Sequence, residues 1–294
     1  MSARRNPSAA AGRAVLVAVA LALCLAVPAW CDGIPTPEEA VAKARALVGQ
    51  GRQADAETYL EDLVAEENGA HAENATVLLE AARLSASAET SRTYAARAIE
   101  RTRNDALLEA AHMLRGDSYF AESFYVSASR EYEAAATHSS GRGPGLADLK
   151  RARSILAGGD AGAAVEAYRT IVDWGATPGE ITPVAEVGLA RALLAAGRPE
   201  EAAEQFERTA RVYAENEVRI RALAGAAESH EAAGADTAAV AALTVLVSDY
   251  PSSYEAVLAR ERLRTYSLPD STLLYDEVPD TTALPGGPQE STEQ

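Results

Sequence analysis

Four histidines are the side chains in this chain best suited to metal binding or proton transfer. His71, His112, His138 and His230 are each separated from the next by 26 residues or more. Two metal-binding histidines on one helix face need a spacing of the His-x-x-x-His type, so the sequence predicts no metal site. His230 stands between carboxylates in Glu228-Ser229-His230-Glu231. Consecutive helical residues point to different faces, however, and we expect His230 to pack between helices rather than to catalyse.

Other catalytic motifs are missing from the sequence. It contains no Gly-x-Ser-x-Gly elbow, and the glycine-rich stretch at 141–145 lacks the Lys-Ser or Lys-Thr that completes a phosphate-binding loop. We interpret that stretch as a linker. Carboxylates are abundant because the chain has 43 acids, which by itself carries no catalytic meaning. The sequence therefore predicts a protein that is not an enzyme and needs no cofactor.

The N-terminus has the pattern of a secretory signal peptide. Three arginines precede an apolar run at 14–27, which is followed by Pro28-Ala29-Trp30-Cys31. The run is shorter than the ~20 residues of a membrane-spanning helix. We expect residues 1–31 to be a signal removed after Ala29 or Cys31, giving a periplasmic or otherwise exported chain without direct membrane insertion. An uncleaved membrane anchor is the alternative, and bulky Trp30 argues against lipid attachment at Cys31.

Charge narrows the class of partner. The formal net charge is −16 at pH 7, which disfavours nucleic acid and anionic lipid because both attract cationic surfaces. No basic residue follows Arg264, and residues 267–294 combine acids with proline and glycine. We expect this segment to be a disordered tail. Its apolar stretch at 273–278 is either solvated with the rest or a short docking motif.

The elements that position these residues follow from an internal repeat. A small or helix-breaking residue is followed five residues later by alanine, and four residues after that by a larger apolar residue. These triplets are Gly51, Ala56 and Leu60; Ser123, Ala128 and Tyr132; Gly159, Ala164 and Tyr168; Gly197, Ala202 and Phe206; and Gly234, Ala239 and Leu243. Another small residue stands seven places before each turn. Such spacing aligns side chains on one helix face, so each unit is predicted to be a helix pair.

Two stretches resemble the tetratricopeptide repeat: Arg115-Gly116-Asp117-Ser118-Tyr119 continuing to Ala135, and Gly188-Leu189-Ala190-Arg191 continuing to Phe206. The resemblance covers residues 36–266. It implies an all-α, right-handed superhelical solenoid of about six antiparallel helix pairs plus a C-terminal capping helix. The family's tryptophan is absent from every unit. The second unit, residues 73–102, fits loosely, and we expect its inter-helix turn to be two or three residues longer.

The last unit suggests a setting for the chain. Residues 246–256 are similar to the Tyr-Pro-x-Ser signature of bacterial envelope members, which include Tol-Pal accessory proteins and the lipoprotein of outer-membrane assembly. The resemblance implies a non-catalytic protein-binding scaffold in the cell envelope. A structural subunit of such an envelope assembly machine is the alternative. The identity of the protein or peptide partner, the pathway and the oligomeric state stay open.

The resemblance also implies a binding surface, because the first helix of each pair lines the concave face of such a solenoid. Counting along those helices, we expect the site to contain Arg45, Arg83, Met113, Asp117, Phe120, Leu149, Arg153, Leu156, Val187, Arg191, Leu194 and Glu228. Four units place an arginine between mostly apolar residues, a pattern suited to the carboxylates and apolar side chains of a peptide. The alternative is that these arginines are solvated or pair with neighbouring acids.

The repeat register predicts a difference between adjacent residues. Ala202→Arg should destabilise the protein by about 3 kcal/mol or more, because it forces a long charged side chain between packed helices. Glu201→Arg should change stability far less, since residue 201 is expected to face water. Thermal melting of the two variants tests the register, and equal shifts in melting temperature would show that it is wrong.

Overall fold

The computed structural model describes residues 35–65, 71, 74–141, 143–175, 181–213 and 217–266. The predicted signal peptide and acidic tail lie outside these ranges. The described part consists of α-helices with no strand. The helices are α2 (Pro37–Gly49), α3 (Gln53–Ala65), α4 (Ala75–Leu84), α5 (Ala88–Arg101), α6 (Asp105–Ala121), α7 (Tyr125–His138), α8 (Leu146–Ala157), α9 (Ala161–Trp174), α10 (Ile181–Ala195), α11 (Pro199–Val212), α12 (Glu217–Ala232), α13 (Asp236–Asp249) and α14 (Tyr254–Thr265).

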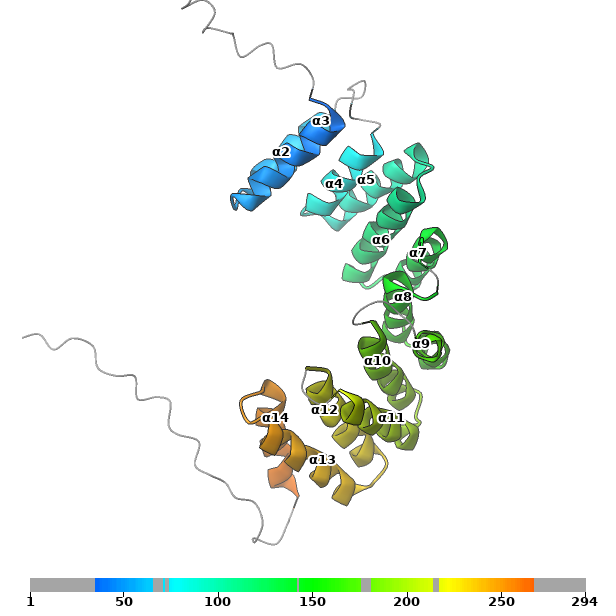
Figure 1. Ribbon diagram of the computed structural model, residues 1–294, viewed down its shortest axis with the longest axis vertical. Coiled ribbons are helices and arrows are strands. Elements are labelled where there is room, and N and C mark those ends of the chain that lie inside the picture. The colour runs from blue at the N-terminus through cyan, green and yellow to red at the C-terminus, as the bar shows by residue number, and fades with distance from the viewer. Residues whose placement is uncertain are drawn as a thin grey trace, which may run out of the picture.

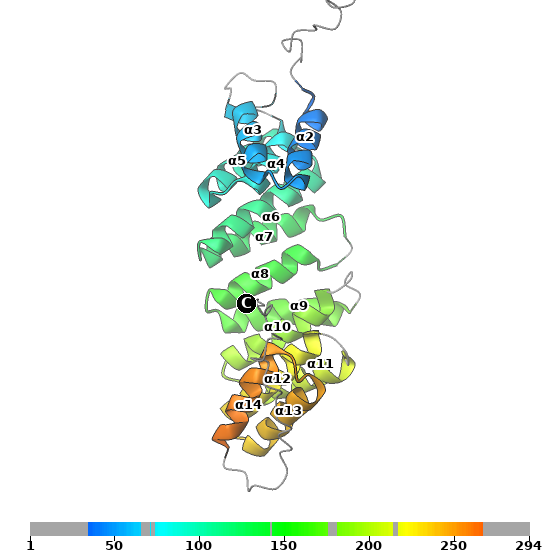
Figure 2. The same ribbon diagram turned by 90° about the vertical axis from the view of Figure 1, so that its left-hand side faces the viewer.

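The helices form six consecutive pairs, α2 with α3 through α12 with α13, and α14 follows the last pair. Figure 1 shows the pairs arranged along an arc, with α4, α6, α8 and α10 on its inner side and α5, α7, α9 and α11 on its outer side. The view in Figure 2 shows the pairs stacked one after another along the long axis. The predicted all-α solenoid of six pairs and a final helix is confirmed. No helix of the described part is long and apolar enough to cross a membrane.

The predicted turn residues do end the first helices. Gly51, Gly159, Gly197 and Gly234 all have positive φ, and Ser123 adopts the same left-handed conformation with φ of 64°. The expectation of a longer turn in the second unit is wrong. Residues 85–87 join α4 to α5, the same length as the turns of the other units. Without a glycine, α4 ends in the extended residue Ser85, and the Ser87 hydroxyl caps α5 by accepting from the Thr90 amide.

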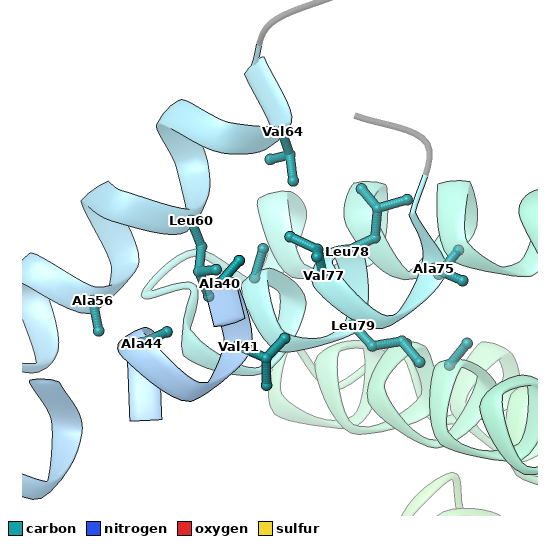
Figure 3. Packing of buried hydrophobic residues seen from close by; sticks show 13 residues of the cluster. Ala40, Val41, Ala44, Ala56, Leu60, Val64, Ala75, Val77, Leu78 and Leu79 are labelled. Atoms are coloured by element: carbon teal, nitrogen blue, oxygen red, sulfur yellow. The ribbon is translucent and has the colours of Figure 1, made fainter. Parts of the chain in front are cut away.

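Small residues let the helices approach closely at every crossing. All five repeat alanines, from Ala56 to Ala239, are completely buried, and the larger apolar residue four places later is at most 4% exposed in each unit. Figure 3 shows this packing at the first unit, where Ala44, Ala56 and Leu60 meet between α2 and α3. The buried surface is therefore a series of thin seams between neighbouring helices.

Three aromatic rings pack against glycine rather than alanine. A Cβ added to Gly188 would lie 2.3 Å from the Tyr168 ring, and one added to Gly225 would lie 2.4 Å from the Phe206 ring. In both cases the ring of one unit covers the first helix of the next. Tyr132 differs, because its ring packs on Gly116 of its own unit. These rings fill the space that a β-carbon would otherwise take.

The apolar core is divided near the middle of the arc. One cluster runs from α2 to α6, and two others, which share α10, run from α8 to α14. Two charged contacts reach from α8 to α6: the Lys150 ammonium lies 2.7 Å from Asp117 Oδ1, and the Arg153 guanidinium lies 4.9 Å from the centre of the Phe120 ring. Charged side chains thus join the two halves on the concave side, and α7 packs against both α6 and α8.

The contact between Gly188 and Tyr168 predicts an effect of one methyl group. Gly188→Ala should destabilise the protein by about 1–3 kcal/mol, because the new Cβ overlaps the Tyr168 ring. Gly162→Ala in α9 is the control, since its Cβ would lie 3.8 Å from Asp160 Oδ1 and nothing else is close. That change should be neutral or slightly stabilising. Denaturant unfolding of both variants measures the difference, and a Gly188→Ala protein as stable as the parent would contradict the packing.

Candidate binding groove on the concave face

The structure places the twelve predicted site residues on the first helices, α2, α4, α6, α8, α10 and α12. The six charged side chains are exposed, and the six apolar ones are half-buried or buried. The set therefore combines solvent-facing charges with apolar surface, as a binding face requires. It does not form one uniform stripe, because the partners of the charged residues differ along the arc.

Arg45 and Arg83, the predicted site arginines of the first two units, both pair with the carboxylate of Glu80. Arg45 Nε lies 2.9 Å from Glu80 Oε1, and its second contact, from Nη2 to Glu80 Oε2, is 3.1 Å. Arg83 Nη1 lies 3.5 Å from the same carboxylate, whose side chain is only 7% exposed. Pairing with Glu80 raises the pKa of Arg45, first through the hydrogen bond and then through charge attraction. Arg45 and Arg83 therefore pair with a neighbouring acid, which was the alternative to a role in peptide binding.

Arg153 and Arg191 lie in different surroundings. Arg153 stacks over Phe120, and neither arginine forms an ion pair with a carboxylate among residues whose positions the structure describes. The reason lies three residues before each arginine. Glu80 occupies that position before Arg83, whereas Lys150 and Gly188 occupy it before Arg153 and Arg191. The carboxylate that pairs with the arginines of the first two units is therefore absent from the equivalent positions of the fourth and fifth units.

These two arginines share one concave groove. Its volume is about 660 Å³, and it brings together four predicted residues, Arg153, Leu156, Val187 and Arg191. The groove is also lined by Tyr168 of α9, Val184 of α10, and Val218 and Arg221 of α12. The groove thus spans three consecutive first helices, and each of them contributes one arginine beside apolar side chains.

Tyr168 adds a hydrogen-bond donor to the groove. Its hydroxyl has no hydrogen-bond partner among the described residues. Burial raises the pKa of Tyr168 to about 12, although the nearby charges of Arg153 and Arg191 oppose the shift. The hydroxyl therefore stays protonated at neutral pH and can donate to an oxygen of a bound molecule.

The remaining predicted residues lie outside this groove. Asp117 and Phe120 line a smaller cavity of about 160 Å³ with Arg153, where Asp117 accepts hydrogen bonds from Lys150 and from the Tyr132 hydroxyl. Met113, Leu149 and Leu194 line neither cavity, and Glu228 is exposed on α12. The fourth and fifth units therefore contain the arginines of the predicted face that have no carboxylate partner among the described residues.

A second sizeable cavity, of about 520 Å³, lies between the second helices α11 and α13 over α12. Half of its lining residues are alanines, and Leu223 and Val245 add larger apolar side chains. Its arginines are engaged, because Arg219 pairs with Asp249 at 3.0 Å and Arg211 lies 3.7 Å from Glu207. This cavity offers apolar surface but not the unpaired charge of the concave groove.

Three of the four histidines join neighbouring helices. His230 Nε2 lies 2.8 Å from Glu207 Oε1, so it packs between α12 and α11 as predicted. His112 Nδ1 lies 2.9 Å from Glu131 Oε2, which also places α6 against α7. Within the described ranges, no three His, Cys, Asp or Glu side chains are grouped closely enough to hold a metal ion.

Sequence reasoning missed six groove residues: Ala157, Tyr168, Val184, Gly188, Val218 and Arg221. Tyr168 was assigned to the packing seam, and it does pack there, but its side chain also reaches the groove from a second helix. Val184 gave a weak signal, because it lies one helical turn before Val187 on the same helix. The repeat pattern contained no signal for Arg221, since its place in the groove depends on how α12 stacks on α10.

The two equivalent tyrosines should respond differently to loss of the hydroxyl. Tyr132→Phe should destabilise the protein by about 1 kcal/mol, because it removes the 2.7 Å hydrogen bond to Asp117. Tyr168→Phe should leave stability nearly unchanged, since the hydroxyl faces the groove. Urea unfolding of the two variants gives the comparison. A large destabilisation by Tyr168→Phe would mean that its hydroxyl has a structural partner.

Comparison with known proteins agrees with this architecture. Residues 221–253 match the tetratricopeptide repeat family, and no curated protein matches the chain. A tetratricopeptide repeat protein from Parabacteroides merdae is similar in structure, with a TM-score of 0.58 at 16% identity, covering 78% of this chain and 86% of that one. PilW, a widely conserved type IV pilus biogenesis factor, gives a TM-score of 0.57 at 15% identity, covering 78% of this chain and all of PilW. Pseudomonas aeruginosa PilF gives 0.50 at 13% identity, covering 77% and 97%. The chain therefore has the tetratricopeptide-repeat fold, and its sixth unit also carries the sequence pattern of that repeat.

Proposed function

We propose that the chain is a non-catalytic scaffold of the bacterial cell envelope that binds an acidic segment of a partner protein in its concave groove. The observation that carries this proposal is the pair Arg153 and Arg191. They occupy equivalent positions of adjacent units, line the same groove and have no carboxylate partner among the described residues. In a chain with a net charge of −16, an unpaired cationic site is an unusual feature that favours an anionic ligand.

The groove suits a peptide better than a small anion. Leu156, Val184 and Val187 provide apolar surface between the two arginines, so a segment with apolar residues beside its acids fits both components. The Tyr168 hydroxyl adds a donor for a backbone carbonyl or a carboxylate. Each charge-assisted hydrogen bond contributes about 1.5–3 kcal/mol. Recognition by both arginines at once therefore favours acids spaced along a chain.

Two observations support the envelope setting. The sequence at 1–31 has the pattern of a secretory signal peptide, although it lies outside the described residues. PilW, which has a similar fold, is a type IV pilus biogenesis factor. At 15% identity this likeness concerns the fold, so the partner of this chain is defined here only by its chemistry: a segment that carries acids beside large apolar side chains.

The proposal is tested by selecting partners from a display library of random short peptides. Selected sequences should be enriched in Asp or Glu next to large apolar residues. Arg153→Glu combined with Arg191→Glu should weaken their binding by about 3 kcal/mol or more, because two charge-assisted contacts are lost and repulsion is added. Titration calorimetry at moderate salt measures the affinity, and the melting temperature should stay near that of the parent.

Arg169→Glu combined with Arg208→Glu is the matched control. These arginines lie on the second helices α9 and α11, so the net charge changes equally while the groove stays intact. The control should bind selected peptides almost as the parent does, with a small loss from long-range charge alone. Equal losses in both double variants, or undiminished binding by the groove variant, would move the site elsewhere.

A further inference from the structure

The chain contains a segment with the composition that the groove accepts. Residues 267–294 include six acids and no Lys, Arg or His. At 273–278 the sequence is Leu-Leu-Tyr-Asp-Glu-Val, which places Asp276 and Glu277 directly beside large apolar side chains. Residues 273–278 thus have the same combination of acids and large apolar side chains as the partner segment proposed to bind the groove.

The described part ends beside α12, a helix that also lines the groove. The Tyr266 hydroxyl lies 2.8 Å from Glu231 Oε1, and Arg262 Nε lies 3.1 Å from the same oxygen, so the chain leaves α14 beside the C-terminal end of α12. Ten residues of α12 separate Glu231 from Arg221 at the edge of the groove, a helical rise of about 15 Å. Figure 1 shows α14 beside α12 at the end of the arc. The chain therefore leaves the described part from a helix that packs against the groove-lining helix α12.

The intervening chain is comparable in length to the path along α12. Residues 267–272 can span up to about 20 Å when extended. The path consists of the helical rise of about 15 Å between Glu231 and Arg221 and the side chains that join Tyr266 to Glu231. A chain of this reach can bring residues 273–278 toward the α12 edge of the groove.

Electrostatics also favours this position over the rest of the concave face. Arg45 and Arg83 are already paired with Glu80, and Asp117 accepts the Lys150 ammonium. Farther along the arc, Glu228 is exposed and would repel the acids of the segment. Arg153 and Arg191 are the charges of this face that an acidic segment can contact without displacing a carboxylate among the described residues.

We propose that residues 273–278 bind in the groove of Arg153, Tyr168 and Arg191 of the same chain, so that a partner must displace them. This inference rests on the proposed function, because it assigns an intramolecular competitor to the same groove. A short linker gives a tethered ligand an effective concentration in the millimolar range. Even a weak intrinsic affinity then keeps the groove largely occupied and lowers the apparent affinity for a partner.

The experiment uses the full chain and a fluorescein-labelled synthetic peptide with the sequence of residues 270–284. Asp276→Arg combined with Glu277→Arg disables the tethered segment and should strengthen binding of the free peptide by at least about tenfold over the parent, because competition is removed. Glu290→Arg combined with Glu293→Arg makes the same charge change outside the segment and should bind as the parent does. Fluorescence anisotropy measures all three.

A third variant locates the binding site. Adding Arg153→Glu and Arg191→Glu to the Asp276→Arg, Glu277→Arg chain should abolish peptide binding. Undiminished binding by this variant would place the segment elsewhere and overturn the proposal. Equal affinities of the parent and the Asp276→Arg, Glu277→Arg chain would also overturn it, as would a peptide that binds neither.

The outcome is separable from that of the proposed function. If library-selected peptides still require Arg153 and Arg191 while the tail variants change nothing, the groove binds partners but not its own segment. If selected peptides bind independently of the two arginines, the groove itself is not the site. Competition by the unlabelled 270–284 peptide against a selected peptide shows directly whether the two share the groove.

Discussion

Close approach of neighbouring helices is the constraint on which this structure depends. In the five units that follow the repeat pattern, one helix presents alanine or glycine, and the facing helix fills the space with a leucine, tyrosine or phenylalanine side chain. Thin seams of this kind bury apolar surface without a thick core, which suits a chain with few Phe and Trp residues. Because each unit contacts only its neighbours, the geometry of one seam fixes where the next pair begins.

The same seams position the groove. Tyr168 lies where it does because Gly188 of the next unit leaves room for its ring, and that placement brings its hydroxyl into the groove beside Arg153 and Arg191. Tyr132, at the equivalent repeat position, covers Gly116 of its own unit and donates to Asp117 instead. Two tyrosines with the same place in the repeat thus have different chemical roles.

Charge pairing divides the concave face into two regions. In the N-terminal region a single buried carboxylate, Glu80, engages two arginines and links α2 to α4. In the fourth and fifth units lysine and glycine replace that carboxylate, and the arginines stay available. The same repeat position therefore differs between units: the acid joins helices in one place, and its absence leaves cationic surface in the other.

The sequence by itself determined the repeat, the helix pairs, the buried alanines and the location of the candidate residues on the first helices. These follow from spacing along one helix, which is a local property readable from periodicity. The length of the second-unit turn was predicted wrongly, because Ser85 and Ser87 end one helix and cap the next without a glycine. Only the tertiary structure decided which arginines are paired. Arg45 meets a carboxylate 35 residues away, and Arg221 joins the groove through the stacking of α12 on α10. Such contacts depend on distances across units, which the repeat pattern leaves undetermined.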